Sequence, residues 1–144
     1  MNIKLYHIIL LALLLLAGHA TALRVGLYQG TVWVDMPLHF LGGAFLGISW
    51  LWILAKAKGK MGEPSDFFVG ISIVGFSLFG SFVWELFEYG LLVFFTGFSE
   101  SFKLYSRSVS DAFSDMALGL LGGVVAALIH SYRNKRITQF PKYK

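Results

Sequence analysis

The chain has 144 residues, of which 56% are hydrophobic and 14% charged, with a formal net charge of +4. A soluble domain carries about 25% charged residues, so this composition excludes an ordinary soluble domain, and the length suits one domain, residues 1–144. The lack of cysteine excludes disulfides, thiolate zinc sites and iron–sulfur clusters. In so apolar a chain the positive charge indicates loop orientation and not nucleic-acid binding.

Four apolar stretches predict the fold. They cover approximately residues 5–22, 37–55, 67–90 and 112–132, and each approaches the roughly 20 residues that a membrane helix needs. We therefore predict an all-α fold, a polytopic membrane bundle of about four transmembrane helices. The first stretch has an alternative interpretation, because Lys4, the apolar run and Ala20-Thr21-Ala22 also fit a cleavable signal peptide.

The basic residues predict the orientation of the bundle. With a cytoplasmic N-terminus, nine of them lie on the inner side, and the outer side holds only Arg24, Lys103 and Arg107. This asymmetry follows the positive-inside rule. It predicts a multi-pass protein of the cell (inner) membrane with a cytoplasmic C-terminus, with membrane lipids as partners and no nucleic acid. The connecting segments 56–66 and 99–110 are predicted as loops.

Polar and small residues recur every four positions, which places them on one face of a helix. The second and fourth stretches carry two such stripes: Asp35, His39, Gly43, Gly47 and Asp111, Asp115, Gly119, Gly123. The third stretch carries Ser77, Ser81 and Glu85, with Glu88 one turn on. Because G-x-x-x-G allows helices to approach closely in lipid, we expect the stripes to face each other. Their polar ends would then form an outward-facing cluster.

The carboxylates of this cluster are the candidate site. A charged residue inside the bilayer costs roughly 2.5–3.5 kcal/mol, so these groups must be protonated, paired or metal-bound. The candidate catalytic residues are Glu85, Glu88, Asp111 and Asp115. The candidate metal ligands are these four and His39, which suit Mg, Mn or Zn. The candidate supporting residues are Asp35, Tyr89 and Arg107. In the alternative interpretation, Asp35 and Asp111 serve as helix caps.

Three blocks carry a resemblance to a known family. They are Asp35-x-x-x-His39-Phe40-x-x-Gly43, Trp84-Glu85-x-x-Glu88-Tyr89, and Asp111-x-x-Ser114-Asp115-Met116 followed by Gly122-Gly123. Their order resembles the YjdF-like family of small bacterial inner-membrane proteins and, more loosely, VanZ-like membrane proteins. The resemblance covers about residues 34–123 and implies where the site lies. The chain departs from the family pattern at Ser108 and Ala112, where an acidic residue and a threonine are usual.

Three functions fit these features. The first is a divalent-metal-dependent membrane enzyme that acts on a lipid or lipid-linked substrate. The second is a cation- or proton-coupled transport or relay protein, in which the same carboxylates change protonation. The third is a structural membrane module without chemistry. A transporter needs a polar route to the inner face, where the helices offer little beyond Ser49, Ser72 and Ser77, so the sequence favours the first.

Overall fold

The computed structural model describes residues 3–28, 33–62, 64–105 and 108–139. Within these ranges every regular element is a helix, in the order α1 (Leu5–Arg24), α2 (Met36–Met61), α3 (Asp66–Phe94), α4 (Thr96–Phe102) and α5 (Val109–Gln139). All except α4 are long and apolar enough to cross a membrane. The predicted all-α bundle with four candidate membrane helices is confirmed.

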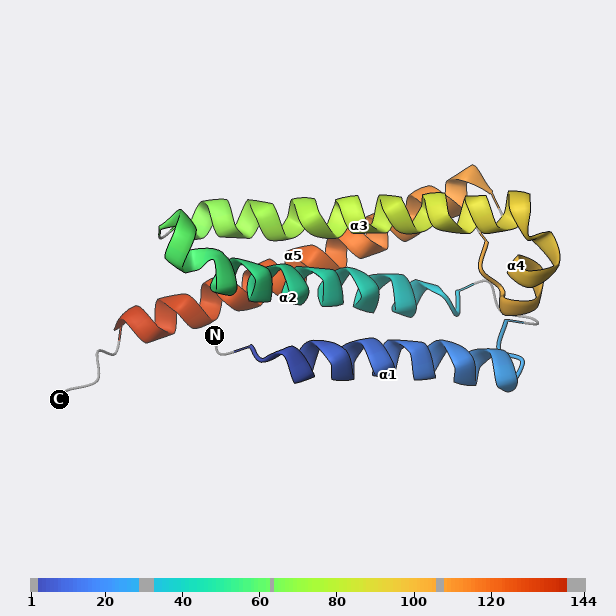
Figure 1. The fold of residues 1–144 in the computed structure, drawn as a ribbon, viewed down its shortest axis with the longest axis horizontal. Coiled ribbons are helices and arrows are strands. Elements are labelled where there is room, and N and C mark those ends of the chain that lie inside the picture. Colours follow the sequence, from blue (N-terminus) through green and yellow to red (C-terminus); the bar gives the residue numbers. More distant parts are fainter. Residues whose placement is uncertain (1–2, 29–32, 63, 106–107, 140–144) are drawn as a thin grey trace.

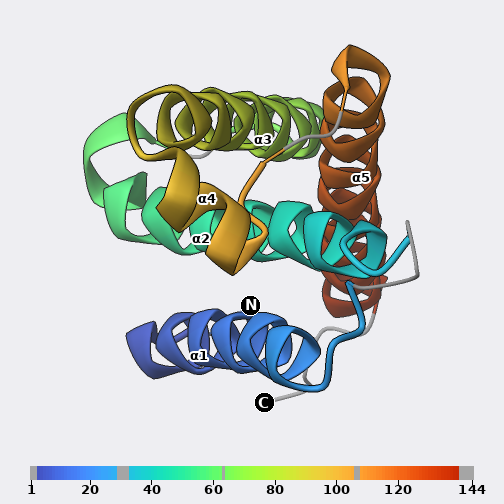
Figure 2. The same ribbon diagram turned by 90° about the vertical axis from the view of Figure 1, so that its right-hand side faces the viewer.

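α1, α2 and α3 run along one axis, α5 crosses them obliquely, and α4 lies at one end of the bundle (Figure 1). α1 and α3 run towards this α4 end, whereas α2 and α5 begin near it and run away. Figure 2 shows α2 between α1 and α3, while α5 crosses one side of α2 and α3. The closest packing is among α2, α3 and α5, and α1 packs mainly on α2.

α2 extends farther than the sequence predicts. The helix continues through the lysine-rich segment 56–61 and ends at Gly62, whose φ of 75° suits glycine. The prediction of a loop from Lys56 is therefore wrong for its first half, because alanine and lysine are good helix formers and one glycine is tolerated. α3 then begins after Ser65, whose hydroxyl accepts a hydrogen bond from the amide of Phe68 at 3.2 Å.

The segment after α3 is more helical than the predicted polar loop at 99–110. α3 ends at Phe94, and the short helix α4 follows at once and ends at Lys103, whose φ is 54°. α5 begins at Val109 and not at Ala112. Ser108 explains the earlier start, because its hydroxyl accepts a hydrogen bond from the amide of Asp111 at 3.1 Å and so caps the helix.

The predicted glycine contacts are confirmed. A side-chain carbon would overlap atoms of a neighbouring helix at each of four positions, Gly43, Gly47, Gly119 and Gly123. The closest approach joins α2 to α5, where the neighbours of Gly43 are backbone atoms of Gly119. From α3, the buried Ser77 donates a hydrogen bond to the carbonyl of Gly43 at 2.9 Å. The small residues thus bring α2, α3 and α5 close enough for their polar groups to share one site.

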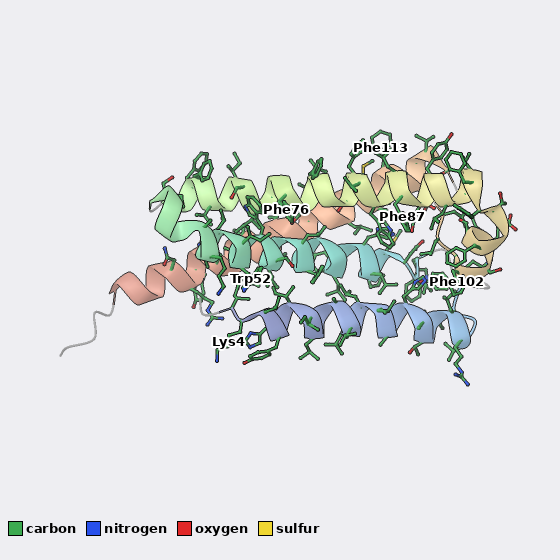
Figure 3. All side chains as sticks on the ribbon, in the orientation of Figure 1. Lys4, Trp52, Phe76, Phe87, Phe102 and Phe113 are labelled. Atoms are coloured by element: carbon green, nitrogen blue, oxygen red, sulfur yellow. The ribbon has the colours of Figure 1, made fainter. Side chains whose placement is uncertain are left out.

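The half of the bundle away from α4 is closed by an apolar core. It consists of Leu51, Val69, Ile73, Ala126 and Ala127. Large apolar side chains also cover the outside of the helices (Figure 3), among them the exposed Phe79, Leu86 and Phe113. Extensive exposed apolar surface marks a site of contact with membrane or protein, as expected for helices that face lipid.

Candidate functional site

Polar side chains from three helices converge near the α4 end. His39 lies in the first turn of α2, Glu85 in the second half of α3 and Asp115 in the second turn of α5. Glu85 and Asp115 are only 8% and 3% exposed, although both belong to apolar helices. Buried carboxylates are retained only where a proton, a cation or hydrogen bonds stabilise them. The site therefore requires a partner for its negative charge.

The imidazole ring of His39 lies between the two buried carboxylates. Its Nδ1 is 3.9 Å from Oε1 of Glu85, and its Nε2 is 3.7 Å from Oδ2 of Asp115. Both distances exceed those of hydrogen bonds. One ligand atom from each of the three residues lies within 4.8 Å of the other two. Since atoms that bind one Zn at about 2.0–2.2 Å can be at most about 4.4 Å apart, a small side-chain movement would complete a three-ligand metal site.

A second group of three carboxylates shares a residue with the first. Ligand atoms of Asp35, Asp111 and Asp115 also lie within 4.8 Å of one another. Asp35 occupies the N-cap position of α2, as the alternative interpretation has it, but its side chain makes no cap hydrogen bond. Asp111 is not a cap, because it lies within the first turn of α5 and Ser108 caps that helix. The partial positive charge at the starts of α2 and α5 favours these carboxylates. We call His39, Glu85 and Asp115 the histidine group, and Asp35, Asp111 and Asp115 the aspartate group. Asp115 thus belongs to both groups.

Glu88 stands apart from both ligand groups. It is 6% exposed, and its Oε1 accepts a hydrogen bond from the indole Nε1 of Trp84 at 2.9 Å. Trp84 is one turn earlier on α3, so the bond lies along that helix and fixes the direction of the carboxylate. Glu88 lines a pocket together with His39 and Asp115. Its position suits contact with a bound molecule better than a place among the three-residue ligand groups.

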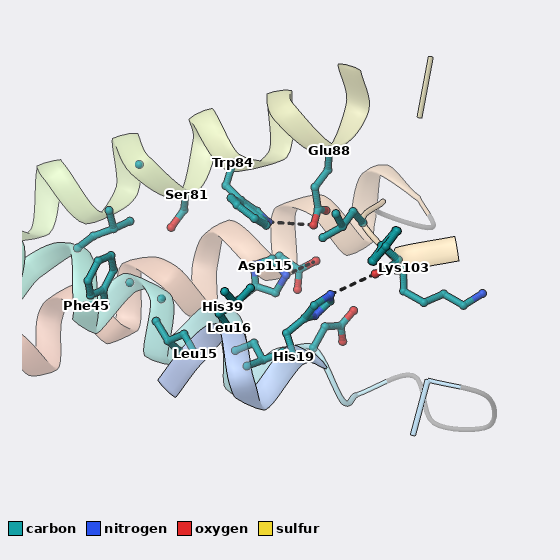
Figure 4. Close-up of a pocket in the computed structure, with 18 of the residues that line it drawn as sticks. Leu15, Leu16, His19, His39, Phe45, Ser81, Trp84, Glu88, Lys103 and Asp115 are labelled. Carbon is teal, nitrogen blue, oxygen red and sulfur yellow. Dashed lines mark hydrogen bonds and ion pairs between the residues drawn. The ribbon is translucent and has the colours of Figure 1, made fainter. Parts of the chain in front are cut away.

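The pocket beside the site has a volume of about 500 Å³, within the range of about 300–1,000 Å³ that is usual for ligand sites. Its walls come from α1, α2 and α3, from Phe102 of α4 and the segment that follows it, and from Asp115 of α5. Figure 4 shows Glu88, Asp115 and Lys103 towards one end and Leu15 and Phe45 towards the other. The pocket therefore has a polar end next to the ligand groups and an apolar end within the bundle.

His19 of α1 closes the polar end of the pocket. Its Nε2 lies 3.1 Å from the carbonyl oxygen of Phe102, and its Nδ1 lies 2.9 Å from the hydroxyl of Tyr28. Because a carbonyl only accepts, Nε2–H donates to Phe102, and a neutral His19 accepts at Nδ1 from Tyr28. Burial, and next the carboxylates of Asp35 and Glu88, raise the pKa of Tyr28 to about 12. Tyr28 is thus a neutral donor at physiological pH.

One of the candidate supporting residues, Tyr89, is not brought to the site. Tyr89 is 68% exposed and belongs neither to the ligand groups nor to the pocket. Tyr89 follows Glu88 by one residue, and each residue of an α-helix is rotated by about 100° from the one before. The side chain of Tyr89 is therefore directed outward. Arg107 lies outside the described residues. Asp35, in contrast, is a member of the aspartate group.

Several pocket residues are missed by the sequence reasoning, namely His19, Tyr28 and Trp84. For His19 a signal exists, because Ala12, Leu15 and His19 are spaced as one helix face and all three line the pocket. Lys103, one of the basic residues that the sequence places on the outer side, directly follows α4 and lines the pocket.

The comparisons with known proteins place the chain in a family. No curated protein and no solved structure matches it, and the looser VanZ-like likeness gains no support. One family model, described as predicted membrane protein (DUF2238), matches residues 1–136. That range contains the four candidate membrane helices and every residue of both ligand groups. The chain therefore belongs to the DUF2238 family of predicted membrane proteins.

Proposed function

We propose that this protein is a divalent-metal-dependent membrane enzyme that acts on a lipid or lipid-linked substrate. One observation carries the proposal: the buried Asp115 belongs to two three-residue ligand groups at the polar end of a pocket within the membrane bundle. The motifs that supply these residues are those in which the chain resembles YjdF-like proteins. By the positive-inside rule, the site faces the extracytoplasmic side.

The donor atoms fit a divalent ion. The histidine group offers one imidazole and two carboxylates, a set that suits Zn or Mn, and the aspartate group offers oxygen alone, which suits Mg or Mn. Five carboxylates belong to the site: Asp35, Glu85, Glu88, Asp111 and Asp115. Repulsion between like charges grows as the local dielectric constant falls. One protonated imidazole would offset only one of these charges, whereas a divalent ion offsets two.

Each residue then has a distinct role. His39, Glu85 and Asp115 would bind the ion, with Asp35 and Asp111 next to it. When bound, such an ion supplies Lewis acidity for a phosphoryl or acyl oxygen and lowers the pKa of a water ligand. Glu88 lies outside the ligand groups, lines the pocket and is oriented by Trp84. It is therefore our candidate for the general acid or base.

The proposal is tested by thermal unfolding of the detergent-purified protein with Mg, Mn or Zn. A ligand at 100 times its dissociation constant stabilises the folded state by about 2.7 kcal/mol. We expect the wild type to gain stability with at least one ion, Asp115→Asn to lose the gain, and Glu88→Gln to keep most of it. Glu100→Gln is the matched control, because this exposed carboxylate of α4 lies outside both groups and the pocket. If no ion stabilises the wild type, the proposal fails.

Transport or proton relay is the second candidate. The same buried carboxylates favour it, because ionisable groups within membrane helices often carry protons or ions. The apolar core around the fully buried Ile73 stands against it, since that core fills the half of the bundle away from α4. A pH gradient across proteoliposomes that dissipates faster with wild type than with Asp115→Asn would favour the relay over the enzyme.

A further inference from the structure

The pocket has the chemical division of a lipid molecule. Glu88, Asp115 and Lys103 lie towards one end, where Phe102 and Leu104, the chain neighbours of Lys103, also line the pocket, and Leu15 and Phe45 lie towards the other end. Figure 4 shows this separation along the length of the pocket. A soluble polar substrate would leave the apolar half unfilled, and a hydrocarbon alone would make no polar contact with the other half. The division suits a molecule with a hydrocarbon chain and a charged head.

The pocket lies where two membrane helices are not packed together. α1 packs mainly on α2, whereas α3 packs on α2, α4 and α5. Side chains of both α1 and α3 nevertheless line the pocket. Because α1 and α3 are both candidate membrane spans, an opening between them would face hydrocarbon when the helices lie in a bilayer. A molecule that enters there comes sideways from the bilayer.

The polar end is held together by contacts between distant segments. His19 joins α1 to Tyr28 and to the carbonyl of Phe102. The next residue, Lys103, has a φ of 54°, in the left-handed region that non-glycine residues rarely adopt. Lys103 lines the pocket. In Figure 4 its side chain extends away from Asp115, and its Nζ lies 6.0 Å from the centre of the Tyr105 ring.

We propose that the pocket binds one hydrocarbon chain of a membrane lipid whose phosphate-bearing head lies at the polar end. The lipid enters between α1 and α3, and its head lies between Lys103 and the histidine group. The placement of the head rests on the proposed function, because a phosphate approaches the carboxylates only when a cation offsets their charge. The chain site does not rest on it, since it depends only on the apolar walls.

Gly42 provides a substitution that fills the chain site without disturbing the bundle. It lines the pocket, and a side-chain carbon built on it meets no atom within 4 Å. A leucine there extends into the pocket. Gly75→Leu is the matched control, because Gly75 of α3 is exposed, its added carbon also meets nothing within 4 Å, and it does not line the pocket. Both variants replace glycine by a better helix former.

The experiment measures binding of hexadecyl phosphate by native mass spectrometry, with Mn²⁺ or with a chelator. Wild type and Gly75→Leu should bind it in Mn²⁺, and Gly42→Leu should bind at least tenfold more weakly. The gain in thermal stability with Mn²⁺ should be the same in all three proteins. Inorganic phosphate and hexadecylamine are the comparison ligands, and both should bind more weakly than hexadecyl phosphate.

The outcomes separate this inference from the proposed function. Equal binding by Gly42→Leu and wild type overturns the chain site, even if Mn²⁺ stabilises the protein. Preference for hexadecylamine, or inorganic phosphate binding as tightly as the lipid, overturns the phosphate-bearing lipid as occupant. Binding that depends on Gly42 but not on Mn²⁺ supports the chain site and overturns the placement of the head beside a metal.

Discussion

The close approach of α2 and α5 at Gly43 leads to a quantitative prediction about stability. A methyl group added at this position would overlap the backbone carbonyl of Gly119, which cannot move without shifting α5. Overpacking of this kind costs about 1–3 kcal/mol. Replacing glycine by alanine also favours the helix by roughly 0.5–1 kcal/mol. The measured effect of Gly43→Ala is therefore the difference of two opposing terms.

A matched variant isolates the packing term. In Gly75→Ala the added carbon meets nothing within 4 Å, so only the gain in helix propensity remains. Subtracting one variant from the other cancels this gain and leaves the overlap. For a chain of this size, 1 kcal/mol shifts the melting temperature by about 2–4 °C. We expect Gly43→Ala to melt about 6–12 °C below Gly75→Ala in detergent, from the upper end of the overlap cost.

The same geometry predicts an order among the glycines. At Gly119 the added carbon would overlap the hydroxyl of Ser81, which can turn away, and would lie 2.9 Å from the Ser81 Cβ, whereas at Gly43 it would overlap backbone atoms. Gly119→Ala should therefore destabilise the bundle less than Gly43→Ala. Thermal unfolding monitored by circular dichroism provides the comparison. Equal melting temperatures for Gly43→Ala and Gly75→Ala would refute the close packing of α2 on α5.

Three further predictions follow from single contacts. Ser77→Ala removes the hydrogen bond to Gly43 and should lower stability by about 0.5–1.5 kcal/mol, measured by thermal unfolding against wild type. The pKa of Tyr28 is about 12 in the folded chain and about 10 in the unfolded chain, so as the pH rises the tyrosine ionises first in the unfolded state. The stability that this difference contributes is therefore complete below pH 10 and is lost as the pH approaches about 12. Tyr28→Phe should therefore lose less stability than wild type over this interval, and an identical alkaline profile would contradict the assignment. His19→Leu removes the hydrogen bonds from His19 to Tyr28 and to Phe102, and so loosens the segment after α4. The amide of Leu104, which donates to the carbonyl of Ser99 in that segment, should then exchange its hydrogen faster. Exchange at the amides around Ile73 should stay unchanged and is the internal control.

The sequence predicts the long helices well because each is a long apolar run in a chain with few charges. It also predicts the facing stripes, since Gly43 and Gly119 pack as their four-residue spacing indicates. The ends of the helices are less predictable. Segment 56–61 combines helix formers with turn formers, and only the structure shows that the helix continues to Gly62. α4 is too short to produce a periodic signal.

The site was only partly predictable for a related reason. His39, Glu85 and Asp115 lie on three different helices, and each belongs to a stripe of residues spaced four apart on its own helix. Their convergence follows because the three stripes face each other. The direct involvement of Asp35 depends on whether its side chain caps α2, which spacing alone does not reveal. The pocket depends on how α1 lies against the other helices and on the turn after α4. Such contacts between distant segments leave no local pattern in the sequence.

The central claim is that the shared residue Asp115 binds a metal ion together with His39 and Glu85. Anomalous diffraction from crystals of the protein grown with Mn²⁺ tests it most directly, because the signal marks the ion's position. We predict a peak within bonding distance of one ring nitrogen of His39 and of carboxylate oxygens of Glu85 and Asp115, absent from crystals of Asp115→Asn. A direct hydrogen bond between His39 and Asp115 with no anomalous peak between them would contradict the account.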